Sequence, residues 1–485
     1  MNKELRRVSV VVLIMFLALF GSTSVIQVFQ QDNLKANPHN VRALDASLSA
    51  ERGSILVAGQ PIATSVPSND RYKYQRKYAN GPLYSAVTGY FTLNQGNTGL
   101  ERALNSTLSG TANDQFLAQL NVILTGQNPK GASVETTIDP AVQQAAWDAL
   151  GNYQGAVVAL NPKTGAILAM VSKPTFDPNS LAVHNTSQVI STYQQLLAAP
   201  GNPLINRTIA GNLNPPGSTF KLVVAPAAFA NGYTPDSQFP NPAHLQLTGT
   251  NTFIGNSEGG ACGGAGATVS IATAMQLSCN VPFAQLGQAL GYDKVAAQAK
   301  AFGFGDSKLR IPMSVTPSVY PQTNGDAQQE LSSFGQGNDR VTPLQLAMIS
   351  AAIANGGTLM TPTLIDSIIS PDLTVQKQNP TVYGQPVTSA IAATMTQLMI
   401  NNVANGVASN ARISGVEVAG KTGTAQNGEG NQPYTLLFTG FAPANNPQVA
   451  VAVVVENGGG IGQSGFGNTV AAPIAKKVIE AVLSR

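Results

Sequence analysis

Strand-like segments stand at both ends of the larger, carboxyl-terminal part of this chain, and helical patterns fill the stretch between them. Residues 155–160 and 166–171 are apolar runs joined by Asn-Pro-Lys-Thr-Gly, a combination typical of a β-hairpin with a short turn. Three further strand-like segments follow near the carboxyl end, at residues 416–425, 436–441 and 449–456. We therefore predict an α/β domain whose sheet is completed by segments that are distant in the sequence.

The middle of this domain is expected to be mostly helical. Asp139 followed by Pro140 is typical of a helix start, with the aspartate as N-cap and the proline in the first helical position. Another helix begins near Ser218 and ends before the stop signal Asn231-Gly232. The remaining helices are expected at residues 142–150, 271–277, 294–302, 343–355, 389–402 and 472–483.

The amino terminus has the pattern of a membrane anchor. Residues 8–29 are apolar apart from small polar side chains, which is long enough for one span, and Lys3, Arg6 and Arg7 precede them. Basic residues stay on the cytoplasmic side, so we predict a cytoplasmic tail at residues 1–7 and an extracytoplasmic remainder. A cleaved signal peptide is the alternative, although no small-x-small cleavage site follows the run.

Composition excludes several classes of function. The formal charge of +3 over 485 residues is too balanced for nucleic-acid binding. Three scattered histidines and two cysteines argue against a metal site or a Ser-His-Asp hydrolase, and we expect no cofactor. Cys262 and Cys279 are 17 positions apart. Outside the cytoplasm they form either a disulfide, which would contribute about 3 kcal/mol, or two buried free thiols.

Residues 30–132 are expected to form a smaller first domain without a catalytic set. Within it, residues 71–78 alternate tyrosine with basic side chains, which predicts a strand with one aromatic face, and residues 101–108 have a helical pattern. Two interpretations of the alternating strand remain. Its charges either contact an anionic wall polymer or lipid surface, or they are simply solvated on an amphipathic strand.

The strongest chemical signal is the stretch Pro215-Pro216-Gly217-Ser218-Thr219-Phe220-Lys221, which holds the only Ser-x-x-Lys of the chain. The prolines and the glycine suit a helix entry, so Ser218 is expected in the first turn with Lys221 on the same face. A lysine among apolar side chains has a lowered pKa and can take the serine proton. The helix amino terminus also directs backbone N–H groups towards a developing oxyanion. Alone, however, a Ser and a Lys three apart are commonly surface decoration.

Two later motifs make that signal specific. Ser278-Cys279-Asn280 is the only Ser-x-Asn, and its two polar side chains converge on a cleft only if the motif lies in a loop. Lys421-Thr422-Gly423-Thr424 presents an ammonium, hydroxyls and a glycine along a strand edge, suited to holding a carboxylate beside an acyl group. A second Lys-Thr-Gly, at Lys163, precedes the serine and is interpreted as a hairpin turn. The ordered set of three motifs is far more specific than any single member.

With these motifs in order, the chain resembles the penicillin-binding proteins of the serine acyltransferase superfamily, and among them the class B enzymes of the actinobacterial PbpA type. About 100 residues before the catalytic region leave no room for the glycosyltransferase domain of class A relatives. One departure is Leu436-Leu437 where the family strand commonly has a tryptophan. The segments that carry the resemblance are residues 52–53, 98–101, 137–139, 155–171, 206–207, 216–218, 334–337, 342–343 and 471–473.

The resemblance implies a fold and a division of the chain. We expect residues 133–485 to form a transpeptidase domain, an antiparallel sheet flanked by helices with a helical subdomain. Residues 30–132 would form a pedestal or dimerisation-like domain, and residues 8–29 the transmembrane anchor. The implied partners are the D-Ala-D-Ala stem peptides of peptidoglycan, β-lactams as inhibitors, the cytoplasmic membrane and a membrane glycan polymerase of the division or elongation machinery.

The resemblance also implies the role of each motif residue. Lys221 would deprotonate Ser218, which attacks the penultimate D-Ala; Ser278 would relay a proton to the leaving D-Ala and Asn280 would orient Lys221. Lys421, Thr422, Gly423 and Thr424 would hold the terminal carboxylate. Attack by an amine of a second stem peptide gives cross-linking, and attack by water gives a D,D-carboxypeptidase or β-lactamase. A β-lactam sensor is the third alternative, and the motifs leave the acceptor amine undecided between diaminopimelate and lysine.

Overall fold

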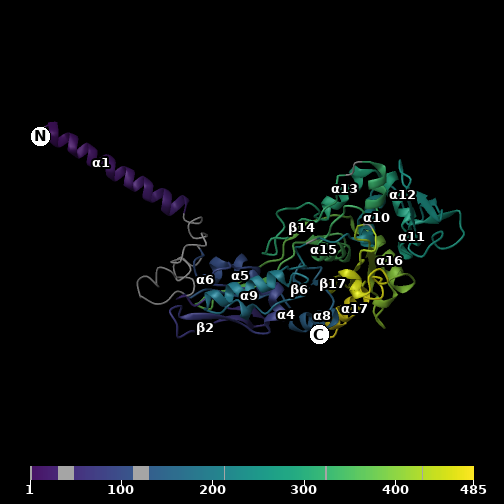
Figure 1. The fold of residues 1–485 in the computed structure, drawn as a ribbon. Coiled ribbons are helices and arrows are strands. Elements are labelled where there is room, and N and C mark those ends of the chain that lie inside the picture. The colour runs from purple at the N-terminus through teal and green to yellow at the C-terminus, as the bar shows by residue number, and fades with distance from the viewer. Residues whose placement is uncertain (1–2, 31–48, 113–129, 212, 323–324, 429) are drawn as a thin grey trace.

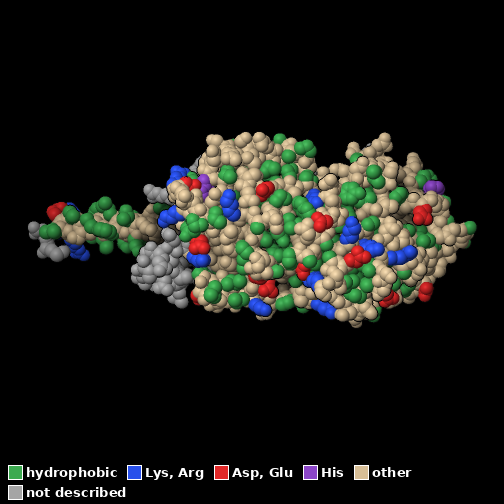
Figure 2. All heavy atoms as spheres, turned by 90° about the horizontal axis from the view of Figure 1, so that it is seen from below, with side chains coloured by type: hydrophobic (Ala, Val, Ile, Leu, Met, Phe, Trp, Pro, Cys, Tyr) green, Lys and Arg blue, Asp and Glu red, His purple; other side chains and the backbone are tan. Residues whose placement is uncertain are grey.

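The computed structural model describes residues 3–30, 49–112, 130–211, 213–322, 325–428 and 430–485 (Figure 1). Residues 1–2 of the expected tail, and residues 31–48 and 113–129 of the expected pedestal domain, lie outside the described residues. Helix α1 (Lys3–Ser24) is followed by a π-helical turn, η1 (Val25–Phe29). The helical stretch Lys3–Gln27 is long and apolar enough to cross a membrane by length and composition, and Figure 2 shows its hydrophobic side chains.

A five-stranded antiparallel sheet forms the centre of the carboxyl-terminal part and confirms the predicted pairing of distant segments. Its order is β15-β16-β17-β5-β6, so that a hairpin from early in the chain completes a sheet of late strands. Val157 of β5 pairs with Val453 of β17, and nearly every side chain in these strands is buried. The strands are β5 (Gly155–Leu160), β6 (Ile167–Lys173), β15 (Ala419–Ala425), β16 (Thr435–Ala442) and β17 (Val449–Val455).

Helices cover both faces of this sheet, as strands buried on both sides require. On one face, α8 (Pro140–Leu150) packs against α17 (Ala471–Leu483). The N-cap prediction for α8 is confirmed, because the Asp139 side chain accepts hydrogen bonds from the N–H groups of Ala141 and Val142. On the other face lies α15 (Pro343–Ala354), which is buried along almost its whole length.

A helical subdomain adjoins the sheet at the edge strand β15. The stretch around Ser218 forms a short 3-10 helix, η4 (Gly217–Phe220), that continues into α10 (Lys221–Phe229), with Pro226 inside the latter. The η4 turn packs on β15, and α10 packs on α16 (Ser389–Ala404), a helix that itself contacts β15. The other helices of this subdomain are α11 (Ile271–Gln276), α12 (Val281–Leu290), α13 (Tyr292–Ala301) and α14 (Asp326–Ser332). Figure 1 shows α10 to α13 at one end of the molecule.

The first domain is not built from its own residues alone. Its six-stranded sheet has the order β13-β12-β4-β1-β2-β3, in which β12 and β13 come from far along the chain. Helix α9 (Thr186–Ala198) adds a second contact, since its Val189 joins a cluster with Tyr90. The strands are β1 (Ile55–Val57), β2 (Gln60–Pro67), β3 (Tyr74–Tyr78), β4 (Ser133–Thr136), β12 (Ile365–Ile369) and β13 (Val375–Lys377).

The interpretation of residues 71–78 as a strand with solvated charges was wrong for its central arginine. Arg76 is buried and its Nε lies 2.6 Å from Glu101 Oε1, while Arg52 Nε lies 2.5 Å from Glu101 Oε2. Burial alone would raise the pKa of Glu101, but the charges of Arg76 and Arg52 lower it. The expected single helix at residues 101–108 is also divided at Leu104, into α5 (Gly99–Ala103) and α6 (Asn105–Ser109).

Charged side chains are sparse and mixed in sign on the face shown in Figure 2. They make up 11% of the chain, against about 25% in an average soluble domain. The surface therefore offers no strongly basic or acidic field on that face, which agrees with the near-neutral net charge.

Candidate active site

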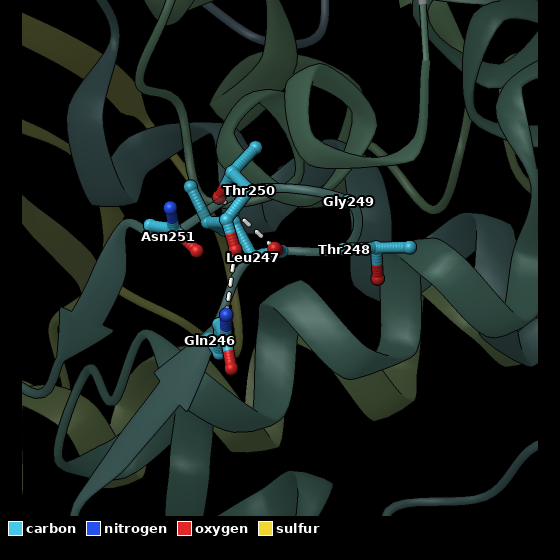
Figure 3. A pocket seen from close by; sticks show the side chains of 6 residues that line it. All are labelled: Gln246, Leu247, Thr248, Gly249, Thr250 and Asn251. Carbon is cyan, nitrogen blue, oxygen red and sulfur yellow. Dashed lines mark hydrogen bonds between the residues drawn. The ribbon is translucent and has the colours of Figure 1, made fainter.

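All three motifs line one open cleft of about 1800 Å³ at the edge of β15. Ser218, Ser278, Asn280, Thr422 and Thr424 contribute to its walls. A second, smaller hollow lies within the loop of residues 246–251, where one turn folds back on itself (Figure 3). None of the six residues around that hollow is charged, and none belongs to a motif. The cleft is therefore the candidate active site.

Ser218 and Lys221 share one face of the η4–α10 turn, as their spacing predicts. Lys221 Nζ lies 3.1 Å from Ser218 Oγ. The same nitrogen donates hydrogen bonds to the Ser278 carbonyl oxygen at 2.7 Å and to Asn280 Oδ1 at 3.0 Å. Burial, together with the nearby charge of Lys421, lowers the pKa of Lys221 well below its ordinary value.

The partners of Lys221 suit a neutral amine. A neutral amine has two N–H donors and one lone pair. The Ser278 carbonyl and Asn280 Oδ1 are acceptors only, so they occupy the two donors, and the lone pair is left for the Ser218 hydroxyl proton. The Ser218 Oγ, 3.1 Å from the Lys221 nitrogen, is within reach for proton transfer.

The Ser278-Cys279-Asn280 motif lies in the loop between α11 and α12. Ser278 has a left-handed backbone conformation, with φ of 58°, which is costly for a residue with a side chain. This conformation directs its carbonyl at Lys221 and leaves its Oγ 2.6 Å from Lys421 Nζ. Burial lowers the pKa of Lys421 to about 7. One serine thus contacts both lysines.

Strand β15 presents its motif on alternating sides. Gly423 faces the turn that carries Ser218 (η4, Gly217–Phe220), here called the catalytic turn, and a Cβ atom on it would stand 3.0 Å from the Pro216 carbonyl oxygen, which is a tight contact. Thr422 and Thr424 line the cleft. The Thr424 hydroxyl accepts a hydrogen bond from the Gly467 N–H at 3.1 Å. Gly467 follows the glycine-rich segment after β17.

Two supports of the motif loop were not predicted as such. Asn256 Oδ1 accepts hydrogen bonds from the N–H groups of Asn280 and Val281, at 2.9 and 3.1 Å, and so holds the start of α12. The structure also pairs Cys279 with Cys262 in a disulfide, between the two polar residues of the motif. The cysteines were visible in the sequence as a pair, whereas an isolated asparagine on a distant loop carries no recognisable signal.

An ion pair lies at the wall of the cleft, which Glu456 and Gln154 line. Arg207 Nε lies 3.1 Å from Glu456 Oε2, and the Gln154 side-chain amide donates to the same oxygen at 2.5 Å. The first Lys-Thr-Gly lies elsewhere. Lys163 occupies the exposed turn between β5 and β6, where its Nζ lies 2.7 Å from Asn446 Oδ1, so it is a surface turn residue.

Fold and sequence together define the family. Residues 155–480 match the model of the penicillin binding protein transpeptidase domain, and residues 52–134 match that of the penicillin binding protein A dimerisation domain. The chain belongs to the penicillin-binding protein family. Its architecture is a mixed α/β transpeptidase domain with an amino-terminal dimerisation domain and one apolar helix near the amino terminus.

Individual relatives resemble the chain over all or nearly all of its length. It is 41% identical to the peptidoglycan D,D-transpeptidase PbpA of Mycolicibacterium smegmatis, over 100% of this chain and 99% of the relative. The structure of penicillin-binding protein A from M. tuberculosis as a ceftriaxone acyl-enzyme superimposes with a TM-score of 0.87 at 40% identity, covering 91% and 100% of the two chains. The corresponding penicillin G acyl-enzyme gives a TM-score of 0.84 at 39% identity, covering 90% and 100%.

Proposed function

We propose that this chain is a peptidoglycan D,D-transpeptidase that cross-links stem peptides through an acyl-Ser218 intermediate and is inhibited by β-lactams. The observation that carries the proposal is the position of Lys221, buried, 3.1 Å from Ser218 Oγ and held by two acceptors. The relatives named as D,D-transpeptidases and the β-lactam acyl-enzyme structures support the same activity.

Acylation begins at Ser218. The neutral amine of Lys221 takes the hydroxyl proton as Oγ attacks the carbonyl carbon of the penultimate D-Ala. The backbone of Thr424 packs against Gly217, where a Cβ would lie 3.1 Å from the Thr424 carbonyl oxygen. By the resemblance to the family, the N–H groups of Ser218 and Thr424 would receive the oxyanion.

Departure of D-Ala requires a proton on its amine. Ser278 lies between the two lysines, so we assign it the relay of the Lys221 proton to the leaving nitrogen. Asn280 orients Lys221 and the substrate amide, and Lys421, Thr422, Gly423 and Thr424 form the edge that binds the terminal carboxylate. The C–N bond breaks, D-Ala leaves, and the acyl group remains on Ser218.

The second half-reaction regenerates the serine. The amine of another stem peptide attacks the ester carbonyl, loses a proton to Lys221, and forms the new amide bond while Ser218 Oγ takes the proton back. No oxidant, metal or cofactor enters this balance. A β-lactam follows only the first half, because its ring-opened leaving group stays attached and blocks the approach of the acceptor amine.

The remaining parts of the proposal concern the place of the enzyme. Residues 8–29 would anchor it, with residues 1–7 in the cytoplasm and the cleft outside; the length and apolarity of Lys3–Gln27 support this. Residues 30–132 would form the pedestal and residues 133–485 the catalytic domain, and a membrane glycan polymerase would dock on the pedestal. The expectation that the polymerase binds there rests on resemblance to the family.

Intact mass spectrometry tests the activity. A soluble form covering residues 30–485 is treated with benzylpenicillin beside Ser218→Ala. We expect one persistent adduct of the mass of the antibiotic, absent from the alanine variant. A transient adduct with hydrolysed antibiotic would instead indicate a β-lactamase or carboxypeptidase, and labelling that survives Ser218→Ala would overturn the assignment of the nucleophile.

A further inference from the structure

A buried carboxyl group lies behind the catalytic turn and takes no part in the proposed mechanism. Asp339 is fully buried, and neither of its carboxylate oxygens has a hydrogen-bond partner among the residues that the structure describes. Burial raises the pKa of Asp339 well above its ordinary value, and the Ser332 hydroxyl and the Arg340 guanidinium offset this only in part. A buried acid without partners is rare in proteins and calls for an explanation.

Asp339 belongs to residues 335–341, here called the supporting segment. Backbone hydrogen bonds join this segment to residues 214–217, the run that leads into Ser218. The run from Asn214 to Gly217 contains two prolines, which have no N–H group. The two remaining donors both reach the supporting segment: Gly217 N–H donates to the Gly335 carbonyl at 2.9 Å, and Asn214 N–H donates to the Val341 carbonyl at 3.4 Å. Asp339 therefore lies between the two anchor points of the run that leads into Ser218.

At Gly335 the supporting segment is in direct backbone contact with Gly217. A Cβ atom on Gly335 would stand 1.9 Å from the Gly217 carbonyl oxygen, so the two backbones touch. On its other side the supporting segment pairs with Val319, through hydrogen bonds of 2.7 and 2.9 Å between Val319 and Arg340. A displacement of the supporting segment is thus transmitted to Gly217 and to the next residue, Ser218.

We propose that Asp339 is a positioning residue that carries a proton in the working enzyme, and that ionisation of its carboxyl displaces the supporting segment and, through Gly217, the Ser218 hydroxyl. A neutral acid fits a buried site, whereas a carboxylate there has only the Ser332 hydroxyl and the charge of Arg340 to offset the loss of its hydration. Two ionisable groups affect this carboxyl: Arg340, whose charge favours ionisation, and Tyr320, whose hydroxyl donates to Gln329 Oε1 at 2.8 Å. The inference rests on the proposed acylation of Ser218.

The test compares acylation by a fluorescent penicillin in Asp339→Asn and in the wild-type protein across the pH range. Lys221 and Lys421 titrate in both proteins, so their effects cancel in the ratio of the two rate constants. The ratio is that of the Asp339→Asn rate constant to the wild-type rate constant. We expect it to be near one at about pH 6 and to rise towards tenfold for each pH unit above the pKa of Asp339, because only the wild type ionises there.

Asp366→Asn, at an exposed position in β12, is the matched control and should give a ratio that does not change with pH. A constant ratio for Asp339→Asn would overturn the proposal, because a merely structural role would change the acylation rate by the same factor at every pH. If Asp339→Asn fails to give a cooperative thermal melt, Asp339→Ala is measured in the same way. Failure of the wild type to be acylated at any pH would overturn the proposed function itself, which separates the two outcomes.

Discussion

At the scale of single residues, the site depends on two buried lysines whose pKa values are both lowered. Both lose hydration, but Lys221 also feels the charge of Lys421, so Lys221 loses its proton first. In the proposed mechanism, the neutral lysine acts as the base while the charged one binds the carboxylate. Both contact Ser278, which explains why this residue is held in a costly backbone conformation.

This difference predicts a bell-shaped pH profile for acylation. The rate rises as Lys221 loses its proton, because only the neutral amine can accept the Ser218 proton, and it falls at about pH 7 as Lys421 becomes neutral. Lys421→Arg should remove the falling limb, since arginine stays protonated. Stopped-flow acylation with a fluorescent penicillin measures both limbs. A wild-type rate that keeps rising well above pH 7 would contradict the assignment of Lys421.

Asn256 is predicted to matter although it reacts with nothing. Asn256→Ala leaves the N–H groups of Asn280 and Val281 without their acceptor, which costs about 1–2 kcal/mol, and frees Asn280 to move. We expect the acylation rate to fall about tenfold, in line with that energy. Asn256→Asp keeps the acceptor and should retain most of the rate. Asn251→Ala, an exposed residue of the neighbouring loop, is the control for non-specific loss.

The motif residues could be found from the sequence because each motif is short and local. Ser218 and Lys221 are one turn apart, so helix geometry alone predicts their contact. Asn256, Gly467 and Asp339 could not be found, because their contacts depend on loops that meet only in the folded chain. The burial of Arg76 was missed for the same reason: its partner Glu101 belongs to another element, and an alternating strand pattern does not distinguish a solvated from a paired arginine.

At the scale of elements, the catalytic turn is held between β15 and the supporting segment. Gly423 contacts it from one side and Gly335 from the other; a Cβ atom would be tight at Gly423 and is excluded at Gly335. The central sheet was predictable, because its apolar strands and turn signals are strong. The pairing of β12 with β4 was not, since a short strand of mixed polarity gives little periodic signal.

Gly335→Ala is predicted to inactivate the enzyme. The new methyl group would stand 1.9 Å from the Gly217 carbonyl oxygen, and the φ of +81° at this position is itself unfavourable for alanine. We expect the acylation rate to fall by at least about a hundredfold, because misplacement of a reacting group by about 1 Å has an effect of that size. Gly384→Ala is the matched control: a Cβ there meets nothing within 4 Å. An active Gly335→Ala would show that the turn does not depend on this contact.

At the scale of the whole molecule, the two matched regions are joined by more than a linker. The sheet of the first domain uses β4, β12 and β13, which follow the boundary proposed at residue 133, and α9 packs on Tyr90. The larger hydrophobic core likewise runs from Ile55 and Val87 into the catalytic helices without interruption. The boundary in the sequence therefore does not coincide with a boundary in packing.

Removal of the first domain is consequently predicted to damage the second. In a fragment of residues 133–485, β4 would lose its parallel partner β1 and expose an unpaired edge. The apolar side chain of Val134 would also be exposed, as would that of Val189, which packs in one cluster with Tyr90. We expect this fragment to aggregate or melt at a lower temperature than residues 30–485, and residues 30–485 to unfold in a single transition by scanning calorimetry. Two separate transitions, or a fragment acylated by penicillin at the full rate with an unchanged melt, would show instead that the catalytic domain folds alone and that the first domain serves only as a docking platform.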